Sequence, residues 1–315
     1  MQSPPLILIT GMHRSGTSLV GNLLSCTGVS MPGPLIEGDI HNPEGYYERS
    51  DITDIQEDLL VALDRWWPSE NGTKRLPNNW LNHRATEEYR TKLEAILRAE
   101  QAVQTRPWGI KDPRTSLLLP IWREVCQELK LELRIVLAVR DPREVVASLC
   151  RRDAAPAGMN AQRAEVIWKY HNKMVLRQSA GISLFLVDYG KWFQGSKTAE
   201  KQLGKLLNFC LGENSYDKNG YLAEAMSQIK PQHRRSNKNF QGIKISTTSK
   251  KIHLALSEGE LSKAMGLFAT ENPSRYEYSM KERMGKYGAN KLNRMLLLLL
   301  QYWNKIRGKV AIGFP

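Results

Sequence analysis

The stretch Leu6–Leu24, LILITGMHRSGTSLVGNLL, constrains the fold of this 315-residue chain more than any other segment. The apolar run Leu6–Ile9 predicts a buried strand, and the amphipathic pattern after Gly16 predicts a helix. The glycine-bounded loop between them, GMHRSGTS, points backbone N–H groups at the N-terminus of that helix, where the helix dipole favours a negative charge. The sequence therefore predicts a strand, an anion-binding loop and a helix.

The loop differs from a triphosphate-binding loop at the residue after its second glycine. The pattern GxxxxGK[ST] has a lysine there, whereas Gly16 is followed by Thr17 and Ser18, and Arg14 is the strong cation of the loop. We expect it to hold a 5′-phosphate and the group attached to it. The alternative is a tight turn whose glycines serve geometry alone. The expected binding residues are Gly11, Met12, His13, Arg14, Ser15, Gly16, Thr17 and Ser18, of which His13 either contacts a ligand or only shapes the loop.

Two further apolar runs, Arg134–Arg140 and Ile182–Tyr189, predict strands that are covered on both faces, as in a parallel sheet. Helical patterns alternate with these strands, which predicts an α/β fold with a P-loop-like parallel sheet flanked by helices. The helices are expected at Ser50–Asp64, Thr86–Gln104, Arg114–Leu129, Pro142–Arg151, Ala161–Ala180 and Thr198–Leu211.

Most of the positive charge lies in the last quarter of the chain. The formal net charge is +13, and residues 233–315 hold 16 Lys/Arg against 5 Asp/Glu, a surplus of 11. The rest of the chain is nearly neutral, which argues against a nucleic-acid partner. We therefore expect a domain at 1–240 and a basic helical C-terminal extension at 241–315. Its segment MLLLLLQYWNKIRGK either packs on the domain or a partner, or lies on an anionic membrane.

The cysteines and histidines give no support for a disulfide framework or a metal site. The four cysteines show no CxxC spacing, and the six histidines show neither HxxxH nor HExxH spacing. No signal-peptide pattern is visible, and no apolar stretch approaches the ~20 residues of a membrane span. We expect a cytoplasmic protein that uses no metal.

A second anion-binding motif is predicted in Ala138–Leu149, AVRDPREVVASL. Its Asp-Pro pair and the following glutamate are explained as a helix N-cap, a first-turn proline and a capping box. Capping does not explain Arg140, at the end of a strand, or Ser148, about two turns into the helix. A guanidinium and a hydroxyl at this edge of a sheet suit a second, monoester phosphate. The alternative is a capped helix with a solvated arginine.

Together, the two motifs resemble those of sulfotransferases. GMHRSGTS resembles their 5′-phosphosulfate loop, and AVRDPREVVASL resembles their 3′-phosphate motif. The segment VDYGKWF resembles the strand-end tyrosine segment of the family, although Gly190 replaces the usual acidic residue; LLNFCLG and IWKYHN add similarity over residues 6–240. The resemblance implies 3′-phosphoadenosine 5′-phosphosulfate (PAPS) as co-substrate. It further implies that Arg140 and Ser148 bind the 3′-phosphate and that Tyr189 contacts the donor.

The resemblance also implies the catalytic residues. The KDP segment that begins at Lys111 resembles one whose lysine approaches the transferring sulfuryl group. Lys111 and Arg14 would then neutralise charge on the sulfuryl oxygens and the leaving phosphate; otherwise Lys111 is a surface lysine beside a capped helix. An acceptor hydroxyl must lose its proton. The segment GYYE implies Glu48 as general base, with Glu37 and His41 as fallbacks, and the alternative for Glu48 is a solvated loop carboxylate.

These features imply transfer of the sulfuryl group of PAPS to a hydroxyl or amine of a saccharide or small-molecule acceptor, with release of adenosine 3′,5′-bisphosphate. Two alternatives stay open. One is a P-loop small-molecule kinase with an atypical loop and Asp188 as strand-end aspartate, and the other is a non-catalytic nucleotide-binding scaffold. We expect the acceptor pocket in the loops Trp66–His83 and Ala154–Asn160. The glycine spacing of Arg283–Lys291 resembles a C-terminal phosphate segment of cytosolic sulfotransferases.

Overall fold

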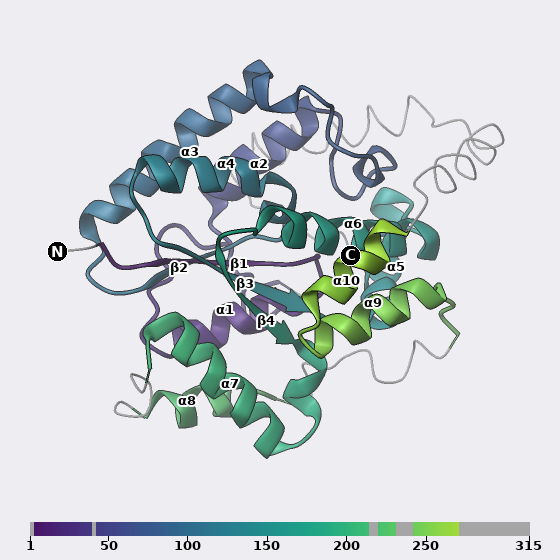
Figure 1. The fold of residues 1–315 in the computed structure, drawn as a ribbon. Helices are drawn as coiled ribbons and strands as arrows, with labels where there is room; N and C mark the ends of the chain where they lie inside the picture. Colours follow the sequence, from purple (N-terminus) through teal and green to yellow (C-terminus); the bar gives the residue numbers. More distant parts are fainter. Residues whose placement is uncertain (1–2, 40–41, 214–219, 231–241, 271–315) are drawn as a thin grey trace.

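The computed structural model describes residues 3–39, 42–213, 220–230 and 242–270 (Figure 1). Its centre is a parallel sheet of four strands in the order β2-β1-β3-β4. The strands are β1 (Leu6–Thr10), β2 (Trp108–Lys111), β3 (Leu133–Val139) and β4 (Ser183–Asp188). The predicted α/β class with a parallel sheet is confirmed, and β2 is the strand that the sequence analysis did not identify.

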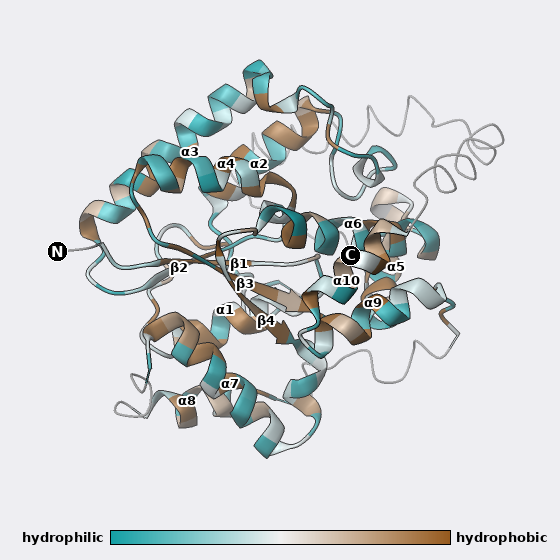
Figure 2. Cartoon of the chain, in the orientation of Figure 1, coloured by the Kyte–Doolittle hydropathy of each residue, from teal (hydrophilic) through white to brown (hydrophobic). Residues whose placement is uncertain are grey.

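The continuous apolar run of β1 is explained by burial on both faces of the sheet. All five residues of β1 are buried. Leu6 and Leu8 join one hydrophobic cluster, whereas Ile7 and Ile9 join another. Because successive side chains of a strand point to opposite faces, each face of the sheet needs its own layer of helices. Figure 2 shows the arrow ends of β3 and β4 in hydrophobic brown, whereas the outer helix α3 is mostly teal.

The helices form two layers of unequal size. The smaller layer covers the face of Ile7 and Ile9 with α1 (Thr17–Ser25), α7 (Ser196–Leu211) and α8 (Tyr221–Ser227). The larger layer covers the other face. It consists of α2 (Ser50–Ala62), α3 (Arg84–Val103), α4 (Thr115–Glu128), α5 (Pro142–Ala157), α6 (Ala161–Gln178), α9 (Thr247–Ser257) and α10 (Leu261–Ala269).

Two segments expected as open loops contain more structure than predicted. Helix α5 continues through the first part of Ala154–Asn160 and ends at Ala157, and its C-cap Gly158 has a left-handed φ of 62°, which suits a glycine. The segment Trp66–His83 contains the 3-10 turns η1 (Asn71–Thr73) and η2 (Trp80–Asn82). Trp67 and Trp80 of this segment are buried in the core. Burial of their large apolar rings holds the segment against the rest of the domain.

Part of the expected C-terminal extension packs on the sheet domain. Helices α9 and α10 contact α5, α6, β3 and β4, and their residues Ile252, Leu256 and Phe268 belong to the main core. The remainder, with the leucine-rich segment and Arg283–Lys291, lies outside the described residues, as does His41.

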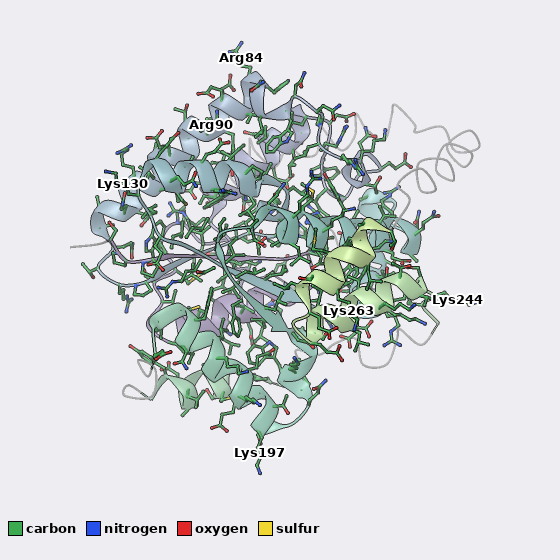
Figure 3. All side chains as sticks on the ribbon, in the orientation of Figure 1. Arg84, Arg90, Lys130, Lys197, Lys244 and Lys263 are labelled. Carbon is green, nitrogen blue, oxygen red and sulfur yellow. The ribbon has the colours of Figure 1, made fainter. Side chains whose placement is uncertain are left out.

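Several basic side chains of the described part of the chain lie at separate places on its surface. Arg84, Lys130, Lys197 and Lys244 point outward around the edge of the view in Figure 3 and do not gather in one patch. Among the described residues, no helix is long and apolar enough to cross a bilayer.

Candidate active site

The predicted anion loop connects β1 to α1, and its two glycines are required by close contacts. Gly11 has φ 139°, and a Cβ there would lie 2.4 Å from the carbonyl oxygen of Ala138. Gly16 has φ 93°, and a Cβ there would lie 2.3 Å from the ring of Tyr189. Among the described residues, no side chain caps the N-terminus of α1 with a hydrogen bond. Its first-turn N–H groups therefore suit an anion in the loop.

Several other residues of the loop are buried. The side chain of Met12 belongs to the core, and Thr17 is buried. The hydroxyl oxygen of Ser15 is buried and has no hydrogen-bond partner in the described part of the chain. A buried unpartnered hydroxyl is costly in a folded protein. The loop thus contains a polar atom that fits a bound oxyanion.

Arg14 brings the two predicted anion motifs into contact. Its Nε donates a hydrogen bond to the hydroxyl oxygen of Ser148, 2.9 Å away and 134 residues later in the chain. Burial, together with the nearby guanidinium groups of Arg152 and Arg140, lowers the pKa of Arg14 to about 10. Arg14 therefore remains charged at neutral pH, but in surroundings that already hold positive charge.

Arg140 directly follows β3 and contacts both the glycine loop and helix α5. Its Nε donates to Glu144, one helical turn later, at 2.8 Å, and its Nη1 donates to the carbonyl oxygen of Arg14 at 3.1 Å. Its guanidinium carbon lies 4.0 Å from the ring centre of Tyr189. Arg140 and Tyr189 thus brace the loop, while the contact to the hydroxyl of Ser148 comes from Arg14.

Lys111, at the end of β2, joins the loop to the GYYE segment. Its side chain is only 2% exposed. Nζ donates to Glu48 Oε1 at 2.5 Å, to the carbonyl oxygen of Tyr46 at 3.0 Å and to Ser18 Oγ at 3.3 Å. The structure therefore brings the predicted cation, the predicted base and the end of the predicted anion loop to one point.

Glu48 is held between two cations. Its second oxygen accepts a hydrogen bond from Nη1 of Arg114 at 2.9 Å. Burial alone would raise the pKa of Glu48, but the charges and hydrogen bonds of Lys111 and Arg114 outweigh burial and lower it. Arg114 also bonds Asp112 and Glu57, whose pKa values are raised by burial. Arg114 lies directly after the KDP segment in the sequence.

His13 ties the loop to the Trp66–His83 segment. Its ring stacks on Trp67 with centroids 3.9 Å apart and planes 14° apart. Burial lowers the pKa of His13 well below its ordinary value, and the nearby charges of Arg114 and Arg152 act in the same direction. Its Nε2 has no hydrogen-bond partner in the described ranges. His13 is therefore a neutral imidazole that packs against an aromatic ring.

The other candidates from the sequence lie in less suitable places. Glu37 is exposed on the loop before α2. Asp188 accepts a hydrogen bond from the N–H of Gly190 at 2.8 Å and so caps the short turn η3 (Tyr189–Phe193). Among the residues that the structure describes, no group of three or more His, Cys, Asp or Glu side chains is placed to hold a metal ion.

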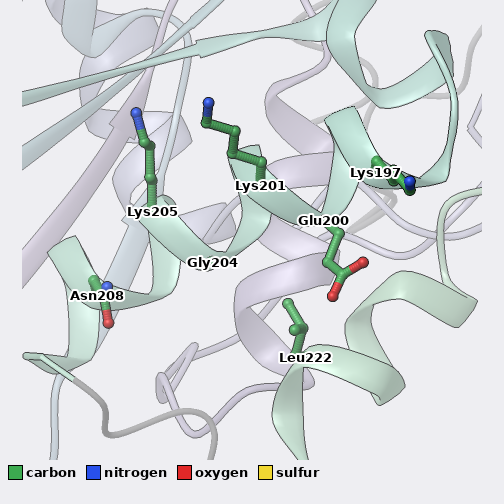
Figure 4. Close-up of a pocket in the computed structure, with 7 residues that line it drawn as sticks. All are labelled: Lys197, Glu200, Lys201, Gly204, Lys205, Asn208 and Leu222. Atoms are coloured by element: carbon green, nitrogen blue, oxygen red, sulfur yellow. The ribbon is translucent and has the colours of Figure 1, made fainter.

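A groove on the surface of α7 and α8 is separate from these residues. It has a volume of about 460 Å³ (Figure 4). Its lining consists of Lys197, Glu200, Lys201, Gly204, Lys205, Asn208 and Leu222. None of the residues predicted to bind the donor or to act in catalysis lines this groove. Lysines spaced four apart on an exposed helix face are typical of a solvated surface.

Comparison with known proteins supports the interpretation of the motifs. A model described as the sulfotransferase family matches residues 5–183, whereas no curated protein sequence matches the chain. Solved structures with a similar fold include the sulfotransferase domain of the Synechococcus PCC 7002 olefin synthase, with 19% identity, TM-score 0.47, and coverage of 87% of this chain and 98% of that one. The sulfotransferase domain of the curacin biosynthetic pathway has 15% identity, TM-score 0.49, and coverage of 82% and 99%.

A third structure, sulfotransferase STF1 from Mycobacterium tuberculosis H37Rv, has 15% identity, TM-score 0.40, and coverage of 72% of this chain and 71% of that one. The segment that the family model matches is more than half of the chain, and it contains the glycine loop, Lys111, Arg140 and Ser148. The resemblance stated from the sequence is thereby confirmed: this chain belongs to the sulfotransferase family.

Proposed function

We propose that this protein transfers the sulfuryl group of PAPS to a hydroxyl or amine of a small-molecule or saccharide acceptor, and releases adenosine 3′,5′-bisphosphate. The observation that carries the proposal is the 2.9 Å hydrogen bond between Arg14 of the glycine loop and Ser148 of helix α5. PAPS has anionic groups at both its 5′ and 3′ positions. A donor site therefore needs two anion-binding segments side by side, and these two segments are in contact.

The loop Gly11–Ser18 would hold the 5′-phosphosulfate, and Arg140 and Ser148 would hold the 3′-phosphate, with Tyr189 beside the loop. In PAPS, the sulfuryl group is attached to the 5′-phosphate, which is the leaving group of the transfer. Fixed cations in a site that excludes water stabilise charge that develops during such a transfer. Arg14 and Lys111 are the cations at the loop, and Lys111 already donates to Ser18 at 3.3 Å.

Glu48 would take the proton from the acceptor. Because its pKa is lowered, it is ionised at neutral pH, as a base must be. The ammonium group of Lys111 donates hydrogen bonds both to this carboxylate and to Ser18 of the loop. Any movement of Lys111 towards an anion in the loop weakens its hold on Glu48 and makes the carboxylate more basic. This arrangement would link the strength of the base to the presence of the donor.

Binding of nucleotides tests the proposal without knowledge of the acceptor. Isothermal titration should show tighter binding of adenosine 3′,5′-bisphosphate than of AMP, and Arg140→Ala should lose most of the affinity for the bisphosphate. A screen of acceptors with labelled PAPS then identifies the second substrate. Equal affinity for AMP and the bisphosphate would contradict the 3′-phosphate assignment, and Mg²⁺-dependent turnover of ATP would favour a kinase instead.

A further inference from the structure

Tyr47, which directly precedes the candidate base Glu48, has a backbone conformation that its side chain disfavours. Its φ is 57°, in the left-handed region that a bulky residue rarely adopts. Such a conformation persists only where the surrounding contacts enforce it, and residues of this kind cluster at functional sites. The contacts around Tyr47 therefore show what the strained conformation achieves.

Both neighbours of Tyr47 form backbone hydrogen bonds with the same residue, Ile36. The N–H of Ile36 donates to the carbonyl oxygen of Glu48 at 2.7 Å, and the carbonyl oxygen of Ile36 accepts from the N–H of Tyr46 at 3.4 Å. An extended chain would separate these two groups too far for one residue to bond both. The chain therefore turns tightly at Tyr47.

The side chain of Tyr47 packs on α1 at a residue that has no side chain, Gly21. A Cβ added to Gly21 would lie 2.8 Å from the Cβ of Tyr47, closer than Cβ atoms approach other atoms in proteins. Glycine in a helix interior is unfavourable relative to alanine. The close contact with Tyr47 is thus a physical reason for a glycine in the middle of α1.

The face of α1 that includes Gly21 also contacts the residues around the GYYE segment. Residues three and four apart are neighbours on a helix, so Ser18 and Asn22 lie on this face. Nδ2 of Asn22 donates to Oε2 of Glu44 at 3.5 Å. In the first turn, Ser18 accepts from Nζ of Lys111 at 3.3 Å. The helix that begins at the anion loop therefore also supports the segment that carries the candidate base.

We propose that Tyr47 is a positioning residue: its left-handed turn, supported on α1 at Gly21, places the candidate base against Lys111. The carbonyl oxygen of Tyr46 accepts from Nζ of Lys111 at 3.0 Å, and Oε1 of Glu48 accepts from it at 2.5 Å. In an extended chain, carbonyl groups point along the sheet and side chains stand out of it, so these two acceptors would not converge. This inference rests on the proposed function, in which Glu48 takes the proton, and deepens it.

The pKa of Glu48 reports whether this placement is intact. Burial raises the pKa, whereas the charges of Lys111 and Arg114 lower it more strongly. Loss of the contact with Lys111 should therefore raise the proton affinity of Glu48 roughly 10-fold or more. Arg114, which also bonds Asp112 and Glu57, is kept in every variant. Carbon-13 NMR of labelled glutamate measures the pKa, and Glu48→Gln assigns the signal.

Two variants of similar size separate the backbone conformation from the tyrosine ring. Tyr47→Asn and Tyr47→Val both remove the ring, but asparagine tolerates a left-handed φ, whereas a β-branched residue does not. Tyr47→Asn should keep the lowered pKa of Glu48, and Tyr47→Val should raise the proton affinity roughly 10-fold or more. Both should bind adenosine 3′,5′-bisphosphate within about 2-fold of the unaltered protein, because the two anion motifs are unchanged.

Substitution of the supporting glycine tests the same contact from the side of the helix. Gly21→Ala puts a methyl group against Tyr47 and should also raise the pKa of Glu48, although alanine favours the helix itself. Gly266→Ala is the matched control and should leave this pKa unchanged. Gly266 also lies within a helix, α10, and a Cβ there would meet no atom of the described residues within 4 Å.

The same pKa of Glu48 in Tyr47→Asn and Tyr47→Val, or an unchanged pKa in Gly21→Ala, would overturn the inference. Failure of the proposed function has a different signature, because the unaltered protein would then not distinguish the bisphosphate from AMP.

Discussion

Replacing Glu48 by glutamine tests the charged cluster at the centre of the candidate site. The carboxylate of Glu48 accepts from buried Lys111 at 2.5 Å and from Arg114 at 2.9 Å. Glutamine keeps one acceptor oxygen, but its NH₂ group must face one of these two donors. Arg114 retains Asp112 and Glu57, whereas Lys111 loses the carboxylate with which it forms an ion pair in the described part of the chain.

Breaking a buried ion pair on one side costs about 3–5 kcal/mol, and the remaining amide oxygen places Glu48→Gln near the lower limit, at about 3 kcal/mol. At roughly 2–4 °C per kcal/mol, the midpoint of thermal unfolding should fall by roughly 6–12 °C at pH 7. Circular dichroism measures this change. Glu37→Gln, at an exposed position, is the matched control and should leave the midpoint unchanged.

The pH dependence of the loss identifies its electrostatic origin. The pKa of Glu48 in the folded protein is below its ordinary value of about 4.3. Its contribution is therefore fully present above the unfolded-state pKa and disappears as the pH falls through the folded-state pKa. The difference in stability between the two proteins should shrink below about pH 4. A fall in midpoint of less than about 2 °C at pH 7, or one that persists in acid, would refute the reasoning.

Three further changes test other parts of the site. Gly16→Ala should abolish binding of adenosine 3′,5′-bisphosphate in a titration, because the new Cβ would lie 2.3 Å from the ring of Tyr189; retained affinity would show that the loop is not the donor site. Lys111→Met, which removes the charge but keeps much of the volume, should lower turnover by roughly 100-fold or more in a labelled-donor assay, as for other single groups that stabilise developing charge; an unchanged rate would exclude Lys111 from catalysis. Trp67→Ala should destabilise the protein by about 3–5 kcal/mol in urea unfolding. It should also raise the pKa of His13 towards its ordinary value, because the ring that buries the imidazole is removed. NMR measures this pKa, and an unshifted value would contradict burial as the cause of the lowered pKa.

Local patterns were sufficient to predict most of the secondary structure. The apolar runs of β1, β3 and β4 and the helical periodicities are properties of short segments, so they are visible without the rest of the chain. Strand β2 was missed because it has only four residues. It exists through pairing with β1, where Trp108 lies opposite Leu6. The end of α5 was placed too early: the helix continues to Ala157 although Pro156, a residue type that disfavours helix interiors, lies in its last turn.

The sequence by itself determined the class of fold and the family and predicted the two anion motifs, because glycine positions, caps and strand ends are local requirements of the backbone. The tertiary structure decided which side chains meet. The pairing of Lys111 with Glu48 spans 63 residues, and that of Arg14 with Ser148 spans 134. A long cationic side chain can reach many places, and the partner that it takes depends on which acids and hydroxyls the folded chain brings near. For that reason the sequence alone could not show that Arg140 pairs with Glu144 and that Arg14 contacts the hydroxyl of Ser148.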